Sequence, residues 1–308
     1  YFFVLGGNMV AKSKLLGSVE AGGTKFVCAV ADSNFNIVDQ IKFKTSNPHD
    51  TLLQTINFFQ KFEVSAIGVG SFGPIGIKEG YDDYGFITKT PKVGWSDFDF
   101  IGTLKTAINV PIFFTTDVNS SVYGEYQFGT VKKDQALVYF TLGTGVGVGV
   151  IQSGLFVGGR SHPEMGHIIL RKHPDDTNFA GVCRFHGDCL EGLASGPSLE
   201  ARTGVRGENI SDDDPVWDII AYYIAQAAWS ATLSFRPDKI IFGGSVSSRP
   251  GLLYKARQQF EQMSNDYLPL PSLDDYIVRP TIENNGSATY GNFALALFAL
   301  QKAENINL

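Results

Sequence analysis

Four residues with metal-binding side chains lie within seventeen positions of the chain, and they are His173, Cys183, His186 and Cys189. The clustering is uneven, because the 308 residues contain only three cysteines and five histidines. Two thiolates and two imidazoles suit tetrahedral Zn²⁺, and the two-residue spacings allow one short loop to wrap around a single ion. Since four protein ligands leave no coordination position for water or substrate, the pattern predicts a structural zinc site and argues against a zinc hydrolase.

Polar side chains flank this cluster on both sides. Glu164 and His167 precede it in the stretch "HPEMGH", and Glu191 follows it closely. Carboxylates and imidazoles make charge-assisted hydrogen bonds to hydroxyl groups, so these three residues are candidates for binding a polyhydroxy ligand such as a sugar. His167 has two other interpretations, which are a satisfied histidine of the core and a replacement ligand of the metal.

Glycine-rich turns follow strand patterns at three places. They contain Gly22, Gly23, Thr24 and Lys25 in the first, Gly143, Thr144 and Gly145 in the second, and Gly243 and Gly244 in the third. Glycine lets backbone N–H groups approach an anion without an intervening Cβ, and Lys25 adds positive charge. One such turn is weak evidence, because a tight hairpin is the commoner explanation. Three in a repeated frame predict a nucleotide in a cleft, although the chain has neither a P-loop nor a dinucleotide-binding motif.

Asp117 follows the apolar strand pattern "PIFFTT" and precedes a helical pattern. A carboxylate at a strand end that opens into a cleft can accept the proton of a substrate hydroxyl as its oxygen attacks phosphorus. The alternative is a helix N-cap, since Asp and Asn are favoured at that position. Asn119 is the better cap candidate, so we expect Asp117 to face the cleft as a general base.

The elements that must position these residues repeat along the chain. Residues 15–32 read as strand, glycine turn and strand, a third strand follows at 37–45, and the strand-turn-strand pattern returns at 136–154. This repetition predicts two similar α/β halves that face each other. Helices are expected at 50–61, from near Asn119 to about 130, at 214–236 and at 287–303, and a further strand is expected at 239–246.

Composition limits the class of protein. A chain of 308 residues that is 44% hydrophobic is long enough for two domains with cores of their own. Its net charge of −6 and the lack of a run of Lys and Arg argue against a nucleic-acid partner. No apolar run suits a membrane span and the start does not match a signal peptide, so we expect a cytoplasmic protein. Residues 1–8, which precede Met9, are given no function.

Together these motifs resemble the ROK family of sugar kinases and repressors, and more closely its bacterial fructokinase branch. The resemblance covers the chain from about Lys14 onward and rests on "EAGGTKFVCAV", "GSFGPI", "GFITKTPKVGW", "TDVNSSVYGE", "TLGTGVGVG", "HPEMGH", the Cys-His-Cys knuckle and "DCLEGLASGPSLEAR". It implies an actin-like, ribonuclease-H-like α/β fold that is duplicated into two domains around an interdomain cleft. We expect domains at 9–118 and 119–292, with the zinc loop in the second and a terminal helix from about 293 to 308 that packs back onto the first.

The resemblance also implies roles for the candidate residues. Asp117 is the catalytic base, the first two glycine turns hold the phosphates of ATP, and the third holds its adenosine. Glu164, His167 and Glu191 hold the sugar. Glu20 stands where many members of the family carry Asp, a change that is usual in fructokinase-like members.

The implied reaction is ATP-dependent phosphorylation of D-fructose to fructose 6-phosphate, with Mg²⁺ bridging phosphate oxygens. A kinase for glucose, mannose or N-acetylmannosamine is the nearest alternative, and a non-catalytic sugar sensor is a more distant one. The family's repressors carry a helix-turn-helix before the first glycine turn, whereas nineteen residues precede Glu20 here, so we expect an enzyme. A homodimer is expected because relatives commonly form one.

Overall fold

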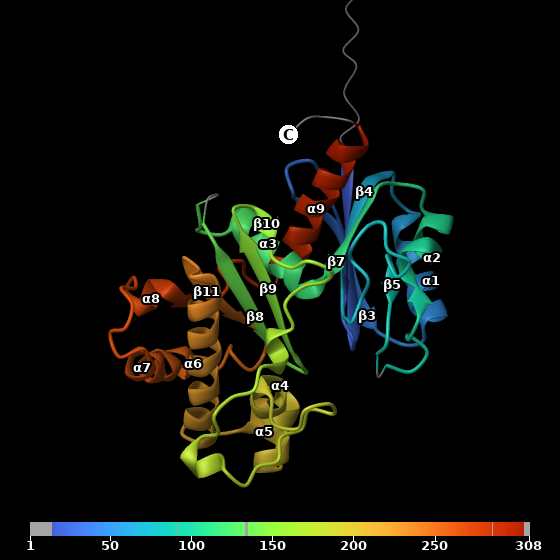
Figure 1. The fold of residues 1–308 in the computed structure, drawn as a ribbon. Coiled ribbons are helices and arrows are strands. Elements are labelled where there is room, and N and C mark those ends of the chain that lie inside the picture. The colour runs from blue at the N-terminus through green and yellow to red at the C-terminus, as the bar shows by residue number, and fades with distance from the viewer. Residues whose placement is uncertain (1–13, 91, 133–134, 285, 305–308) are drawn as a thin grey trace, which may run out of the picture.

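Two five-stranded sheets stand side by side, with helices between and around them (Figure 1). The computed structural model describes residues 14–304 except residues 91, 133–134 and 285. Residues 1–8, to which we give no function, lie outside the described residues. The two sheets supply the strand ends at which the predicted functional residues are placed.

The first sheet has the strand order β3-β2-β1-β4-β7. Its strands are β1 (Leu15–Ala21), β2 (Lys25–Ala31), β3 (Ile37–Lys44), β4 (Val64–Ser71) and β7 (Ile112–Thr116). The first three form an antiparallel meander, whereas β4 and β7 run parallel to β1. The carboxyl ends of β1, β4 and β7 therefore meet at one edge of the sheet.

The second sheet repeats this arrangement, with the strand order β10-β9-β8-β11-β12. Its strands are β8 (Leu137–Leu142), β9 (Val146–Gln152), β10 (Leu155–Phe156), β11 (Lys239–Gly243) and β12 (Ile277–Val278). Again an antiparallel meander is followed by two strands parallel to its first strand. The repeat confirms the prediction of two similar halves, and it gives the turns at 22–24 and 143–145 equivalent positions.

Helices α1 (Pro48–Phe59) and α2 (Phe100–Ala107) cover the outer face of the first sheet. The first begins two residues before its predicted start at 50. Asn47 caps it by accepting a hydrogen bond from the Asp50 N–H at 2.9 Å, and proline at the first helical position suits a helix start.

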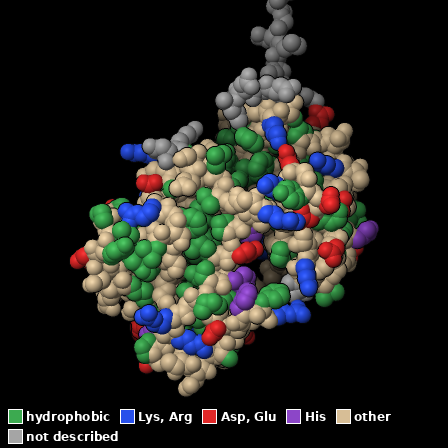
Figure 2. Space-filling view, viewed as in Figure 1, with side chains coloured by type: hydrophobic (Ala, Val, Ile, Leu, Met, Phe, Trp, Pro, Cys, Tyr) green, Lys and Arg blue, Asp and Glu red, His purple; other side chains and the backbone are tan. Residues whose placement is uncertain are grey.

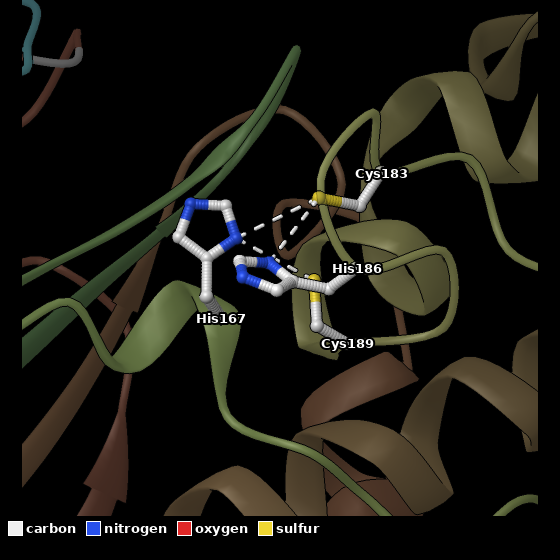
Figure 3. Close-up of side chains that lie close together, drawn as sticks. All are labelled: His167, Cys183, His186 and Cys189. Atoms are coloured by element: carbon white, nitrogen blue, oxygen red, sulfur yellow. Dashed lines mark hydrogen bonds between the residues drawn. The ribbon is translucent and has the colours of Figure 1, made fainter.

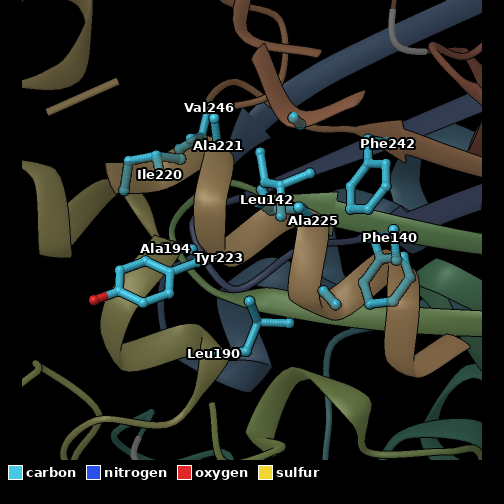
Figure 4. Close-up of a cluster of buried hydrophobic side chains, with 14 of the residues drawn as sticks. Phe140, Leu142, Leu190, Ala194, Ile220, Ala221, Tyr223, Ala225, Phe242 and Val246 are labelled. Atoms are coloured by element: carbon cyan, nitrogen blue, oxygen red, sulfur yellow. The ribbon is translucent and has the colours of Figure 1, made fainter. Parts of the chain in front are cut away.

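Helices α6 (Val216–Phe235) and α7 (Leu252–Ser264) pack against each other and belong to the core of the second half. Figure 4 shows this core, in which Phe140, Leu142 and Phe242 of the sheet lie among Ile220, Ala221 and Ala225 of α6. The rings of Phe140 and Phe242 stack with their centroids 4.9 Å apart. Because several buried residues of α6 are alanines, this helix can approach its neighbours closely.

Helices α3 (Asp117–Phe128) and α9 (Ser287–Ala303) lie between the sheets and pack against each other (Figure 1). Glycines permit their close approach, because a Cβ on Gly291 would lie 1.8 Å from the Ser120 carbonyl oxygen. Phe293 of α9 is buried with Leu16 and Ala66 of the first sheet. The helix that follows the last strand of the second sheet therefore packs on the first sheet.

Glu125 of α3 fixes the segment that leads into α9. Its carboxylate is buried and accepts hydrogen bonds from the N–H groups of Thr281 and Ile282 at 3.0 and 3.2 Å. The hydroxyls of Thr281 and Ser287 donate to it at 2.6 and 2.7 Å. Four donors thus satisfy the buried carboxylate and join the two central helices.

The predicted domain boundary between residues 118 and 119 falls inside α3, which contacts strands of both sheets. The division into residues 9–118 and 119–292 therefore stays a prediction. The shorter elements are β5 (Phe86–Ile87), β6 (Phe98–Asp99), η1 (Met165–His167), η2 (Pro174–Asp176), α4 (Leu190–Ala194), α5 (Gly196–Thr203), η3 (Gly207–Asn209) and α8 (Leu273–Tyr276). Among the described residues, no helix has the length and apolar character that a membrane crossing requires.

Candidate active site and metal centre

Asp117 is the first residue of α3 and directly follows β7. Thr116 caps the helix, because its hydroxyl oxygen accepts a hydrogen bond from the Asn119 N–H at 3.2 Å. The prediction that Asn119 is the cap was wrong, since its side chain is buried in the first turn and donates to the Thr115 hydroxyl at 3.0 Å. The Asp117 carboxylate accepts a hydrogen bond from the Val118 N–H at 2.9 Å and is not needed as the cap.

Asp117 shares a small cavity of about 50 Å³ with Glu20 at the end of β1. Withdrawal from water and the negative charge of Glu20 raise the pKa of Asp117 to about 7. Burial also raises the pKa of Glu20, whereas the charges of Lys25 and Lys42 act in the opposite direction. A carboxyl group that titrates near neutral pH can accept a proton and release it again.

The first glycine turn is tight and has free space beside it. The Gly22 N–H donates to the Lys25 carbonyl oxygen at 3.0 Å, and a Cβ on Gly22 would lie 2.7 Å from that oxygen. A Cβ on Gly23 would meet no atom within 4 Å, and Thr24 is exposed. The Lys25 side chain, by contrast, lines a cavity of about 490 Å³ together with Glu20. The Gly22 N–H is therefore used within the turn, whereas the free space at Gly23 leaves room for a ligand, and the lysine of the turn lines the same cavity as a carboxylate.

The second glycine turn lines another cavity, of about 470 Å³, and Ser245, which follows the third turn, lies in the same wall. The Gly143 N–H donates to the Gly145 carbonyl at 2.9 Å, and Gly143 and Thr144 form part of the wall. Gly243 ends β11, and Gly244 follows it with a φ of +89°. A Cβ on Gly244 would lie 2.3 Å from the Leu142 carbonyl oxygen, so only glycine fits where β11 passes the second turn.

The wall of this cavity contains residues that the sequence analysis did not identify. They are Gly196, Pro197, Leu199, Glu200, Arg206, Gly207, Glu208, Trp217, Ser245, Val246, Ser248, Arg249 and Pro250. The Arg249 guanidinium carbon lies 4.8 Å from the centroid of the Trp217 ring. The Trp217 ring is 3% exposed and the guanidinium lies over it, so the Arg249 cation is the part of this pair that can meet the negative charge or the flat base of a nucleotide.

Four side chains from the chain segment that joins β10 to α4 point toward one another (Figure 3). They are His167, Cys183, His186 and Cys189, and one ligand atom from each lies within 4.8 Å of the others. Cys183 Sγ is 3.7 Å from His167 Nδ1 and 3.8 Å from His186 Nδ1, and Cys189 Sγ is 3.5 Å from His167 Nδ1. Tetrahedral Zn²⁺ with ordinary bond lengths would separate sulfur from nitrogen by roughly 3.6 Å. The donor set and its spacing therefore fit such an ion.

His173 lies outside this group, so its prediction as a metal ligand was wrong. Its Nδ1 accepts a hydrogen bond from the Asp175 N–H at 3.2 Å, and its ring packs edge-on against Tyr222. His167 takes its place, because a β-bridge pairs Ile169 with Cys189 and brings the two segments together. His167 was predicted to hold a sugar, with metal binding as an alternative, and the structure favours the alternative.

The two predicted sugar-binding carboxylates lie in different surroundings. Glu191 accepts a hydrogen bond from the Val146 N–H at 3.1 Å and so joins α4 to the second glycine turn. Glu164 is largely exposed, and its negative charge contributes to the raised pKa of Asp117. Figure 2 shows histidine and carboxylate side chains beside a hollow between the two halves of the molecule. Glu191, two residues after Cys189, therefore links the metal group to the second glycine turn. Glu164 acts on Asp117 through its charge.

A buried ion pair holds residues 176–179, which precede the cysteines of the metal group in the chain. Arg202 donates to the Asp176 carboxylate through Nε at 2.9 Å and through a terminal nitrogen at 2.8 Å. The Tyr223 hydroxyl donates to the same carboxylate at 2.6 Å. The Arg202 guanidinium carbon also lies 3.9 Å from the centroid of the Phe179 ring. These contacts anchor residues 176–179 to α5 and α6 independently of the four metal-type ligands.

Comparison with known proteins finds matches over most of the chain. The model of the ROK family matches residues 16–298. A fructokinase of Streptococcus mutans serotype c is 53% identical over 290 residues, which cover 92% of this chain and 98% of the relative. A fructokinase of Lactococcus lactis subsp. cremoris is 55% identical over 281 residues, covering 91% and 96%. The crystal structure of the ROK hexokinase from Thermus thermophilus matches with a TM-score of 0.76 at 21% identity, covering 94% of this chain and 99% of that one.

Proposed function

The chain belongs to the ROK family, and on that premise we propose that it is a fructokinase, which transfers the γ-phosphoryl group of ATP to D-fructose and releases fructose 6-phosphate. The observation that supports this most directly is the position of Asp117, at the head of α3 beside Glu20 and with a pKa near 7. A buried carboxylate of that basicity can deprotonate a sugar hydroxyl at neutral pH.

In this mechanism the 6-hydroxyl oxygen of fructose attacks the γ-phosphorus, and its proton passes to the Asp117 carboxylate. The bond between the γ-phosphorus and the bridging oxygen breaks, and ADP leaves. MgATP is the second substrate, and its ion would neutralise part of the phosphate charge. Phosphoryl transfer depends mainly on positioning and charge neutralisation, so we assign the first two glycine turns to the phosphates through their backbone N–H groups.

We assign the adenosine of ATP to the cavity that the second glycine turn lines. Gly143 and Thr144 line it beside Ser245, Trp217 and Arg249, so the phosphates and the base can lie along one continuous wall. The sugar is assigned to the cleft near Asp117 and Glu164. Glu191 acts there by positioning, because its carboxylate already holds the backbone of the second turn.

We propose that the group of His167, Cys183, His186 and Cys189 binds one structural Zn²⁺. When bound, the ion would cross-link η1 to the segment before α4. With all four positions filled by protein ligands, it would supply no reactive water. The resulting brace would keep Glu191 against the second glycine turn.

The pH dependence of kcat/KM tests the role of Asp117. The base must be ionised to accept a proton, and its pKa is raised to about 7, so activity should fall about tenfold per pH unit below that value and level off above it. Glu20→Gln removes a negative charge that raises the pKa of Asp117. The pH profile of kcat/KM of this variant should therefore have its midpoint at lower pH than that of the wild type. A profile flat from pH 5 to 8 would contradict the assignment.

The proposed reaction is tested by ADP release with MgATP and a panel of fructose, glucose, mannose and N-acetylmannosamine. We expect the largest kcat/KM with fructose. Release with another hexose in preference would keep the mechanism and change the substrate. No release with any sugar, from folded protein, would reject the kinase and favour the sensor. The cytoplasmic location and the homodimer remain proposals, and light scattering of the purified protein tests the second.

A further inference from the structure

The loop that follows β5 is held firmly beside the first glycine turn. Trp95 of this loop is fully buried, and its indole N–H donates to the Ser46 carbonyl at 2.8 Å. Its ring packs edge-on against Phe72, with centroids 5.4 Å apart. The neighbouring Thr45 hydroxyl donates to the Gly22 carbonyl at 2.7 Å. The segment 45–46 therefore anchors both the loop and the turn, which fixes their relative position.

Lys92 extends from this loop to the tip of the turn. Its ammonium group donates to the carbonyl oxygen of Gly23, and its side chain is half-buried. Within the described residues, that carbonyl is its hydrogen-bond acceptor, and no carboxylate lies within ion-pair distance. An ammonium has three N–H donors, so two remain for a ligand. Gly23 has free space beside it, which leaves room for that ligand.

The other lysine of the turn is placed differently. Lys25 lines the cavity of about 490 Å³ with Glu20 and Lys42, and its charge lowers the pKa of Glu20. Its positive charge is therefore partly balanced by a carboxylate. No carboxylate among the described residues lies within ion-pair distance of Lys92. Of the two lysines, Lys92 therefore has the positive charge that can act on an anion at the turn.

Resting on the proposed function, we propose that Lys92 is a catalytic residue that contacts the γ-phosphoryl group of ATP during its transfer to the sugar. The transferred group spreads its negative charge over three oxygens as the bond to ADP breaks. A preorganised ammonium, already held by the protein before the reaction, stabilises that charge without reorganisation. Lys92 exchanges no proton in the step, because the hydroxyl proton goes to Asp117.

The test compares Lys92→Met, which removes the charge at similar length, with Lys92→Arg, which keeps it. Lys89→Met on the same loop is the matched control, because Lys89 is exposed. Loss of a transition-state donor costs about 10²- to 10³-fold in kcat. We expect Lys92→Met to show that loss with the KM for fructose within about threefold of wild type, Lys92→Arg to recover at least tenfold, and Lys89→Met to behave as wild type.

A transition-state mimic separates this role from a structural one. ADP, Mg²⁺, fructose and aluminium fluoride should form a tight inhibitory complex with wild type and with Lys92→Arg, and a much weaker one with Lys92→Met, while ADP alone binds all three equally. Equal formation of the complex, or a lost kcat that comes with a lower melting temperature and is not recovered by arginine, would overturn the proposal. A wild type without fructose-dependent ADP release would reject the proposed function itself.

Discussion

Replacing Asp117 by asparagine will lower the kcat of fructose phosphorylation by roughly 10²-fold or more, which is the scale of a lost general base. Asparagine has nearly the same shape but cannot take the proton of the sugar hydroxyl at neutral pH. Fructose binding should persist, because asparagine keeps the size and the hydrogen-bonding capacity of the side chain in the sugar cleft and Glu164 is unchanged. The measurement is the steady-state rate of ADP release, with fructose affinity followed by calorimetry.

The same substitution should not destabilise the protein at pH 8. Burial in the folded protein raises the pKa of Asp117 from 3.8 to about 7. Above pH 7 the carboxylate is therefore charged, and the charge is less stable in the buried site than in the unfolded chain, where water surrounds it. The protonated Asp117 carboxyl group stabilises the folded protein at low pH, and this contribution is lost as the pH rises through about 7. Asparagine does not ionise, so the variant does not show this loss. The matched control is Asp266→Asn on the surface, which should leave the rate unchanged. Near-normal turnover of Asp117→Asn would remove the proposed base.

The repeat of the fold could be predicted because each half carries its signal locally. Apolar runs on both sides of a three-residue glycine turn predict a hairpin, and the same pattern at 15–32 and 136–154 predicts the same structure twice. The sequence predicts that α3 starts near Asn119, because Asn is favoured as a cap, whereas the helix starts at Asp117 with Thr116 as its cap. The Asn119 side chain is buried and donates to the Thr115 hydroxyl, so Thr116 is the cap, and this burial follows only from the packing of the folded protein.

The candidate site was predictable where its residues are adjacent in sequence and not where they meet by folding. Spacing favoured His173 as a ligand, but the bridge between Ile169 and Cys189 brings His167 to the metal group instead. Trp217 lies in α6 and Arg249 just before α7, so they meet only because these two helices pack against each other. No local pattern of residues identifies such a pair.

Removing the metal should have the second large effect. Structural zinc sites in small peptides contribute about 10–16 kcal/mol of binding energy to folding, but here Arg202 and Asp176 anchor residues 176–179 of the loop without the ion. We therefore expect a partial loss, with the core of α6 and the second sheet intact and the melting temperature lower by on the order of 10 °C. Fructose affinity should fall with it, because Glu164, which lies beside the proposed sugar site, directly precedes η1, the segment that the ion would cross-link.

Two histidine variants make this prediction specific to the ligands. His167→Asn should lower the bound zinc, measured by mass spectrometry of the purified protein, and should lower the melting temperature as chelation does. His173→Asn should keep one zinc per chain, because asparagine can still cap η2 and the residue lies outside the metal group. Loss of zinc from His173→Asn, with zinc retained by His167→Asn, would instead support the ligand set that the sequence spacing predicts, which includes His173. If complete removal of the metal left both melting and fructose affinity unchanged, the loop would be held by the Arg202–Asp176 pair alone, and the metal would have no structural role.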